Sequence, residues 1–83
     1  MPSPRRSAPP NPRLAERIWS MLKSGRRIDC ELQAHGDAGC DCRICDEDGW
    51  CLYRCHWSRR AQALADAEGQ RQALARDGWM MDG

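Results

Sequence analysis

Cysteine is the residue type in this chain with the most chemistry to offer. Five of the six cysteines fall within residues 39–57, and Cys42 and Cys45 have the Cys-x2-Cys spacing of a zinc knuckle. Cys51, Cys55 and the adjacent His56 are close enough in sequence to complete such a site. The sequence therefore offers a metal hypothesis, in which zinc is held by Cys42, Cys45, Cys51 and Cys55.

Two other uses of these thiols compete with zinc. A disulfide would best join Cys42 to Cys55, but it requires an oxidising compartment. Alternatively, the thiols act as small hydrophobic side chains, because free cysteine is among the residue types most often buried. We favour packing and expect no cofactor, since the second half of the cluster has Cys-x3-Cys spacing in place of a second knuckle.

A catalytic site is the least favoured interpretation, and we expect the protein not to be an enzyme. Cys55 and His56 are neighbours in a predicted strand, so their side chains project to opposite faces and cannot exchange a proton. Asp41 is placed to lie across from His56, but such a pair on an open face is more typical of a surface ion pair. The sequence also shows no glycine-rich phosphate loop and no nucleophile elbow.

Two short strands around Asp48-Gly49 would position these residues. Asp-Gly between alternating segments is a strong hairpin signal, for a turn in which both residues have positive φ. A turn over residues 46–49 would shift the partners by two and keep the faces. The alternation predicts an apolar face toward the core, made of Cys40, Cys42, Ile44, Cys51, Tyr53, Cys55 and Trp57. The polar face would carry Asp41, Arg43, Arg54 and His56, with Cys45, Leu52 and Trp50 near the turn.

The segment before this hairpin contains one predicted strand and one ambiguous stretch. Residues 26–35 alternate between apolar and polar side chains, which is typical of a half-buried strand. Residues 13–24 have an apolar stripe that suits a helix, but Trp19 and Met21 also alternate as in a strand. His35 follows in a glycine-rich loop, where we expect it to cap the turn.

Residues 58–77 predict a helix. Ser58 is a good N-cap, and alanines and leucines supply helix propensity and a narrow apolar stripe. Gly78 is placed to adopt the left-handed conformation after the helix, which would direct Trp79 back onto Leu74 in a Schellman motif. Residues 80–83 are expected to fray.

Length and composition predict one small domain, over residues 14–79. All five prolines lie in the first twelve residues, so residues 1–13 are predicted to be a disordered basic tail. No apolar segment approaches the roughly 18 residues of a membrane span, and no secretory signal is visible. These features predict a cytoplasmic protein with reduced thiols and no membrane contact.

One resemblance adds to this picture. The layout of Trp19-x-Met21, Cys30-Glu31-Leu32, His35-Gly36, Asp48-Gly49, an alanine-rich helix and a final Gly78-Trp79 is similar to small bacterial proteins of unknown function. The resemblance spans residues 18–79 and implies the α+β class, with an antiparallel β-meander of three to four strands followed by one C-terminal helix. It favours a strand over residues 18–23 and implies no activity. The cysteines at core positions depart from the pattern.

Three functions remain open at this stage. An unpaired edge of the meander invites pairing with another protein or a second copy, and exposed Trp50 and Leu52 would suit that contact. A nucleic-acid-binding module would use the basic tail with Arg43, Arg54 and His56 of the polar face, although acidic neighbours would repel phosphates. The third function is the zinc-binding domain. We expect a protein-interaction or structural module.

Overall fold

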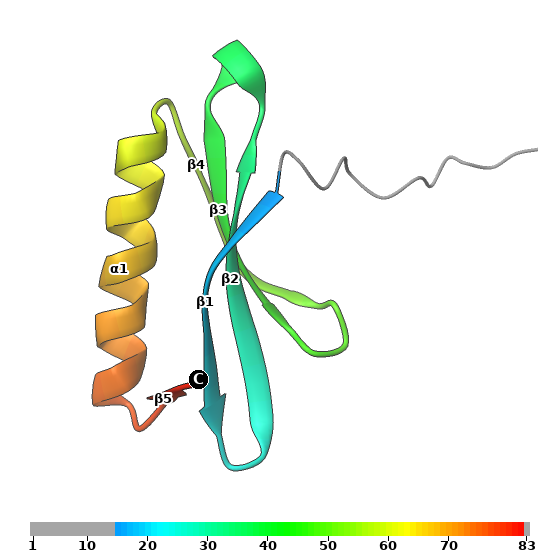
Figure 1. Ribbon diagram of the computed structural model, residues 1–83, viewed down its shortest axis with the longest axis vertical. Coiled ribbons are helices and arrows are strands. Elements are labelled where there is room, and N and C mark those ends of the chain that lie inside the picture. Colours follow the sequence, from blue (N-terminus) through cyan, green and yellow to red (C-terminus); the bar gives the residue numbers. More distant parts are fainter. Residues whose placement is uncertain (1–14, 83) are drawn as a thin grey trace, which may run out of the picture.

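The computed structural model describes residues 15–82, which form a five-stranded antiparallel sheet with one helix (Figure 1). In chain order the elements are β1 (Ala15–Lys23), β2 (Arg26–Ala34), the 3-10 turn η2 (Gly36–Ala38), β3 (Cys40–Asp46), β4 (Cys51–Trp57), α1 (Arg60–Arg76) and β5 (Met80–Met81). The strand order across the sheet is β4-β3-β2-β1-β5. The predicted α+β meander with one C-terminal helix is confirmed, and the predicted tail lies outside the described residues.

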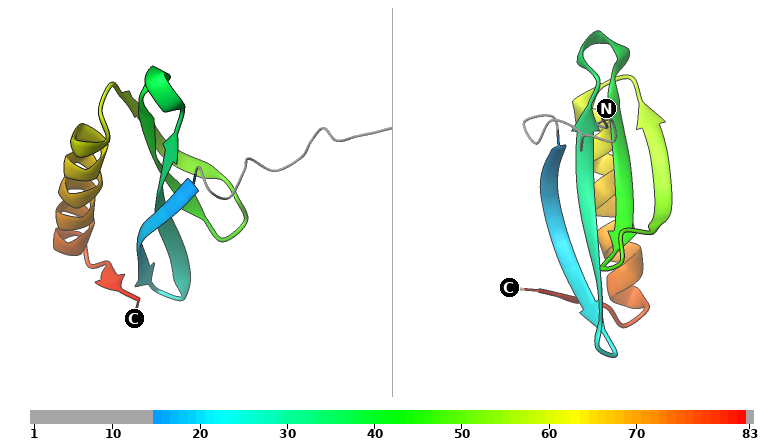
Figure 2. Two further views of the ribbon diagram at one scale, coloured as in Figure 1. Left: turned by 45° about the horizontal axis from the view of Figure 1, so that its top comes forward. Right: turned by 90° about the vertical axis from the view of Figure 1, so that its right-hand side faces the viewer.

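The helix divides the sheet into two unlike faces. The face-on view in Figure 2 shows α1 running along one side of the sheet, where it contacts β2, β3 and β4. We call this side the covered face and the other the open face.

The described part of the chain contains no helix with the length and apolar character that crossing a membrane requires.

The ambiguous stretch before β2 is a strand over its described part. β1 pairs with β2 on one side. On its other side Met21 and Leu22, near the end of β1, pair with β5. A bulge between Arg17 and Trp19 corrects the alternation, so that Trp19 and Met21 both lie in the core. Strand pairing and the burial of Trp19 and Met21 outweigh the helix-like apolar pattern of this stretch.

The turn between β3 and β4 differs from the predicted Asp48-Gly49 turn. Among the two, only Gly49 has a positive φ, at 88°. The Asp46 N–H donates to the Trp50 carbonyl oxygen at 2.9 Å, and the Asp46 carboxylate accepts the N–H groups of Asp48 (3.0 Å) and Trp50 (2.9 Å). An aspartate that binds the backbone two residues ahead stabilises a longer loop, so the side chain of Asp46 decides the turn.

This longer loop changes one face assignment. Cys42 lies opposite Cys55 as predicted, but the register shifts between Ile44 and Cys45. Cys45 therefore lies opposite Cys51, and directly opposed residues share a face of the sheet. The prediction that Cys51 faces the core is wrong, because a bulge in β4 turns it to the open face beside Cys45.

Sulfur and small side chains fill the covered face. The buried residues are Trp19, Met21, Ile28, Cys30, Leu32, Cys40, Cys42 and Ile44 of the sheet, with Ala63 and Ala67 of the helix. Met21, Cys30 and Cys42 are fully enclosed, and the Sγ atoms of Cys30 and Cys42 are 3.7 Å apart. The chain has no phenylalanine, so methionine and cysteine supply much of the bulk between sheet and helix.

The start of α1 differs from the sequence-based prediction, whereas its end agrees with it. The helix begins at Arg60, and its N-cap is Arg59 in place of the predicted Ser58. The Gln62 side chain accepts the Arg59 N–H at 3.1 Å. At the other end the predicted Schellman motif is confirmed: Gly78 has φ 101°, and the Trp79 N–H donates to the Leu74 carbonyl oxygen at 3.0 Å.

The chain continues along β1 after Trp79 as far as Asp82, and Gly83, the last residue of the segment expected to fray, lies outside the described residues. Met80 and Met81 form β5, opposite Leu22 and Met21 of β1. The Asp82 N–H also donates to the Ser20 carbonyl oxygen at 2.9 Å. The turn made by Gly78 aims the chain along β1, and the free backbone groups of that edge then hold it.

Candidate functional site

A nearly enclosed carboxylate is the centre of the open face. Asp41 lies in β3, and its side chain is only 4% exposed. His56 Nδ1 binds Oδ1 at 2.7 Å, while Oδ2 accepts Arg54 Nη2 at 2.8 Å, Arg54 Nε at 3.1 Å and His35 Nε2 at 3.0 Å. The donors come from β4 and from the loop that follows β2. We call these four residues the Asp41 cluster.

The cluster holds Asp41 in its charged form. Burial alone would raise the pKa of this carboxyl group, but the hydrogen bonds from His56, Arg54 and His35 outweigh it and hold the pKa far below its ordinary value. Gly39 makes room for the arrangement. With φ 101°, a Cβ there would collide with the Trp57 carbonyl oxygen and lie 3.0 Å from His56 Nε2.

Other arginines of the open face are also paired with carboxylates. Arg43 binds Glu31 on the neighbouring strand at 3.0 Å, and Arg27 binds Asp29 at 3.2 Å. The Ser20 hydroxyl donates to the same Asp29 carboxylate at 2.5 Å. Burial opposes ionisation of Asp29, yet these bonds hold its pKa below the ordinary value. Arg27 and Arg43, like Arg54, are therefore engaged by carboxylates of the same sheet.

The proposed zinc ligands do not come together. Cys42 and Cys55 are opposed on the covered face, whereas Cys45 and Cys51 are opposed on the open face. Within residues 15–82 there is no group of three or more His, Cys, Asp or Glu side chains that could hold a metal ion. Burial also raises the pKa of Cys30 to about 11, and that of Cys42 further still, so both remain thiols.

A second carboxylate joins the covered face to the helix. Asp66 of α1 accepts the Tyr53 hydroxyl at 2.9 Å and the Trp57 indole N–H at 2.9 Å. Burial, followed by the hydrogen bond to Asp66 and the charge of that carboxylate, raises the pKa of Tyr53 well above its ordinary value. These bonds connect β4 to α1 on the covered face. On the open face, the Asp41 cluster connects β4 to β3 and to the loop that follows β2.

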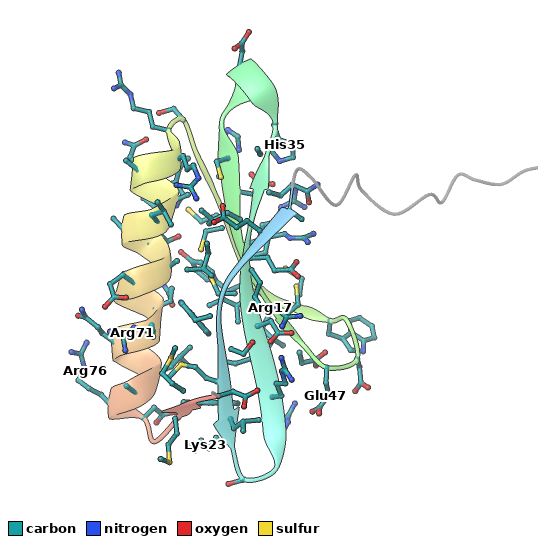
Figure 3. The ribbon with its side chains drawn as sticks, viewed as in Figure 1. Arg17, Lys23, His35, Glu47, Arg71 and Arg76 are labelled. Atoms are coloured by element: carbon teal, nitrogen blue, oxygen red, sulfur yellow. The ribbon has the colours of Figure 1, made fainter. Side chains whose placement is uncertain are left out.

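The predicted contact residues Trp50 and Leu52 stay in solvent. Trp50 is 71% exposed and Leu52 is 56% exposed, beside the outer edge of β4. Figure 3 shows Glu47 at the tip of this hairpin, projecting away from α1, and His35 at the far end of the sheet. Within the described residues β4 pairs with β3 alone, so its other edge is unpaired.

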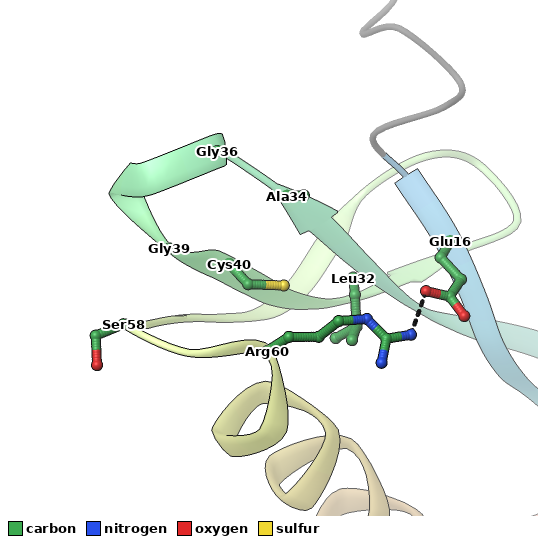
Figure 4. A pocket seen from close by; sticks show the side chains of 8 residues that line it. All are labelled: Glu16, Leu32, Ala34, Gly36, Gly39, Cys40, Ser58 and Arg60. Carbon is green, nitrogen blue, oxygen red and sulfur yellow. Dashed lines mark hydrogen bonds and ion pairs between the residues drawn. The ribbon is translucent and has the colours of Figure 1, made fainter.

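A concave site lies on the covered face beside the start of α1 (Figure 4). It encloses about 290 Å³ and is lined by Glu16, Leu32, Ala34, Gly36, Gly39, Cys40, Ser58 and Arg60. Arg60 Nη2 binds Glu16 Oε1 across it at 2.6 Å. Burial raises the pKa of Cys40, which keeps its thiol protonated and a weak nucleophile.

The sequence indicated only part of this arrangement. Asp41 and His56 are opposite each other as expected, but their pairing with Arg54 and His35 was missed. His35 does not simply cap its turn, because η2 folds the loop so that the imidazole reaches the Asp41 carboxylate. The only indication of the cluster in the sequence was that Asp41 lies between His35 and His56.

Comparison with known proteins adds no relative. The chain matches no protein-family model, no curated protein and no solved structure.

Proposed function

We propose that this domain is a non-catalytic protein-interaction module that pairs through β4 with a second copy of the same chain. The observation that carries the proposal is the unpaired outer edge of β4 in the described part of the chain. An open edge presents a row of backbone N–H and C=O groups that can add another strand.

The bulge near the start of β4 interrupts its edge, but the rest of the strand, from Tyr53 to Trp57, pairs regularly with β3 and has no proline or free lysine to protect it. The one arginine of β4, Arg54, is bound to Asp41. The Asp41 cluster on one face and Asp66 on the other hold the strand in place, so docking would order few additional side chains. At the opposite edge of the sheet, β5 already covers part of β1.

Charge favours a second copy as the partner. In a two-fold antiparallel pairing, the start of β4 in one copy lies beside the end of β4 in the other. The start follows the acidic turn residues Glu47 and Asp48, and the end precedes Arg59. Opposite charges would therefore meet at both ends of the pair, and the exposed Trp50 and Leu52 would gain cover.

The remaining functional hypotheses have less support. Arg43 and Arg54, on which nucleic-acid binding would depend, are engaged by Glu31 and Asp41.

For location we propose the cytoplasm, because all six cysteines are free thiols, the state that a reducing compartment maintains.

Sedimentation velocity over a concentration series tests the proposal. We expect a reversible dimer that weakens as salt is raised, because the paired ends are charged and exposed. Glu47→Arg and Arg59→Glu should each weaken the dimer, and the double variant should recover much of the loss. Arg76→Glu, near the other end of α1, is the matched control and should change nothing. A protein that stays monomeric at millimolar concentration would exclude self-pairing.

A further inference from the structure

Two thiols face each other on the open face of the sheet. Cys45 of β3 is directly opposite Cys51 of β4, next to the turn. Cys51 is exposed and Cys45 is half-buried, and both are free thiols. The pair is separate from the Asp41 cluster and from the cavity beside α1.

The bulge in β4 creates this juxtaposition. In the unbroken register set by Cys42–Cys55 and Ile44–Tyr53, Cys45 would lie opposite Leu52. The one-residue shift after Ile44 brings Cys51 into that position instead. The Asp46 side chain supports the shift by accepting the Trp50 N–H at 2.9 Å, so the turn keeps the two cysteines in line.

The backbone spacing suits a disulfide. Cα atoms of directly opposed residues in an antiparallel pair are about 4.5–5.5 Å apart. Disulfides span Cα separations of roughly 4.4–6.8 Å, a range that includes the spacing of directly opposed residues. In the reduced state the Cys51 thiol donates to the Tyr53 carbonyl oxygen at 3.3 Å, a weak bond that a rotation about χ1 would exchange for the bridge.

We propose that Cys45 and Cys51 form a reversible dithiol–disulfide pair, oxidised by a low-molecular-weight disulfide of the glutathione class. The exposed Cys51 thiolate attacks one sulfur of the oxidant, and one thiolate of the oxidant leaves. Cys45 then attacks the Cys51 sulfur of the mixed disulfide and expels the second thiolate. Two protein thiols are oxidised to one disulfide, and the oxidant is reduced to two thiols, which take up the two protons.

The covered face supplies an internal contrast. Cys42 and Cys55 are also directly opposed, but Cys42 is fully enclosed and α1 lies over that face. Burial raises the pKa of Cys42 strongly and that of Cys45 less so, with the nearby Cys51 thiol adding to the effect at Cys45. Solvent access thus distinguishes two cysteine pairs that are both directly opposed across β3 and β4.

Oxidation would also act on the hairpin that carries Trp50. The bond would close the turn covalently beside the edge of β4 and restrict the motion of the exposed indole. The pair does not depend on the proposed self-association, because both cysteines belong to one chain.

The test uses the full reduced chain in glutathione buffers of increasing oxidised fraction, with an acid quench and intact-mass analysis. We expect a monomer lighter by two hydrogen atoms, a Cys45–Cys51 linked peptide after digestion, and full recovery on adding dithiothreitol. Cys45→Ser should stop at a stable glutathione adduct on Cys51. Cys55→Ser, the matched control on the other face, should still form the bond.

Three results would overturn the proposal. One is a persistent glutathione adduct on Cys51 in the wild-type chain. Another is a Cys42–Cys55 bond formed first. The third is oxidation that yields only dimers linked between chains. Because the proposed self-association is measured by sedimentation under reducing conditions, the two proposals can fail separately.

Discussion

The two faces of the sheet are stabilised by different interactions. The covered face packs Met21, Cys30 and Cys42 out of solvent, and its polar contacts are the buried bond from the Trp19 indole N–H to the Ala67 carbonyl oxygen and the bonds of Tyr53 and Trp57 to Asp66 at its edge. The open face has no such layer over it. Its side chains are joined by carboxylates, with Asp41 at the centre of one network and Asp29 and Glu31 in others.

The difference separates stability from responsiveness. Apolar packing does not depend on the charge state of side chains, so the packed residues of the covered face should hold the fold together over a wide range of pH. Carboxylate networks respond to both pH and salt, because protonation removes the charge and salt screens it. The Cys45–Cys51 thiols lie on the open face, and the free edge of β4 borders it, so the responsive interactions are next to the proposed contacts.

The largest expected effect comes from emptying the covered face. Trp19 is 5% exposed, and its indole N–H binds the Ala67 carbonyl oxygen at 2.9 Å. Trp19→Ala should lower the free energy of unfolding by about 3–5 kcal/mol, because it leaves a large cavity under α1. Urea unfolding followed by far-UV circular dichroism measures this.

Two matched variants identify the cause. Trp19→Phe keeps most of the bulk and should lose only about 1 kcal/mol, the contribution of the hydrogen bond. Trp50→Ala, on the other face, should change stability by less than about 0.5 kcal/mol. If Trp50→Ala proved as costly as Trp19→Ala, the contrast between the faces would be wrong.

Local chemistry explains which features the sequence could predict. The Schellman motif involves residues 74–79 alone, so its glycine and following tryptophan were sufficient. The alternation in β2 and β3 likewise assigned most side chains to the correct face. By contrast, Asp-Gly is compatible with more than one turn, and the choice here depends on the Asp46 carboxylate.

The Asp41 cluster was beyond local inference for a different reason. Strand pairing places His56 opposite Asp41, but the burial of Asp41 also depends on Arg54 and on the fold of η2. An aspartate in a polar-face position is normally solvated, so its enclosure is a tertiary property. The Glu16–Arg60 contact, which joins β1 to the start of α1, is equally long-range.

The next effect concerns the centre of the open face. Asp41→Asn keeps the shape of the side chain but removes the charge that Arg54 and the two histidines bind. We expect a loss of about 2 kcal/mol at pH 7, toward the lower end for charged hydrogen bonds because the donors are partly exposed. Asp37→Asn, in the exposed η2 turn, is the control and should be close to neutral. Equal denaturation midpoints for both variants would contradict a structural role for the cluster.

Acid should weaken the open face first. The pKa of Asp41 in the folded protein lies below its ordinary value of 3.8, so its contribution to stability is complete above about pH 4. That contribution is lost as pH falls below 4 toward the folded-state pKa. Midpoints of urea unfolding between pH 6 and pH 2.5 should fall more steeply for the wild-type chain than for Asp41→Asn. Parallel pH profiles would show that other carboxyl groups govern acid unfolding.

The smallest effect is that of a single ion pair within the open face. Glu31 and Arg43 are directly opposed on β2 and β3, with Arg43 Nη2 3.0 Å from Glu31 Oε1. A double-mutant cycle with Glu31→Gln and Arg43→Gln should give a coupling of about 0.2–1 kcal/mol, as for other cross-strand pairs. At 1 M salt the Debye length falls to about 3 Å, so most of this coupling should disappear. The Glu16–Arg60 pair, whose side chains are both more than half exposed, should couple still more weakly. A coupling that salt leaves unchanged would mean that the open face is held by packing as well, and the contrast between the two faces would have to be narrowed to the Asp41 cluster.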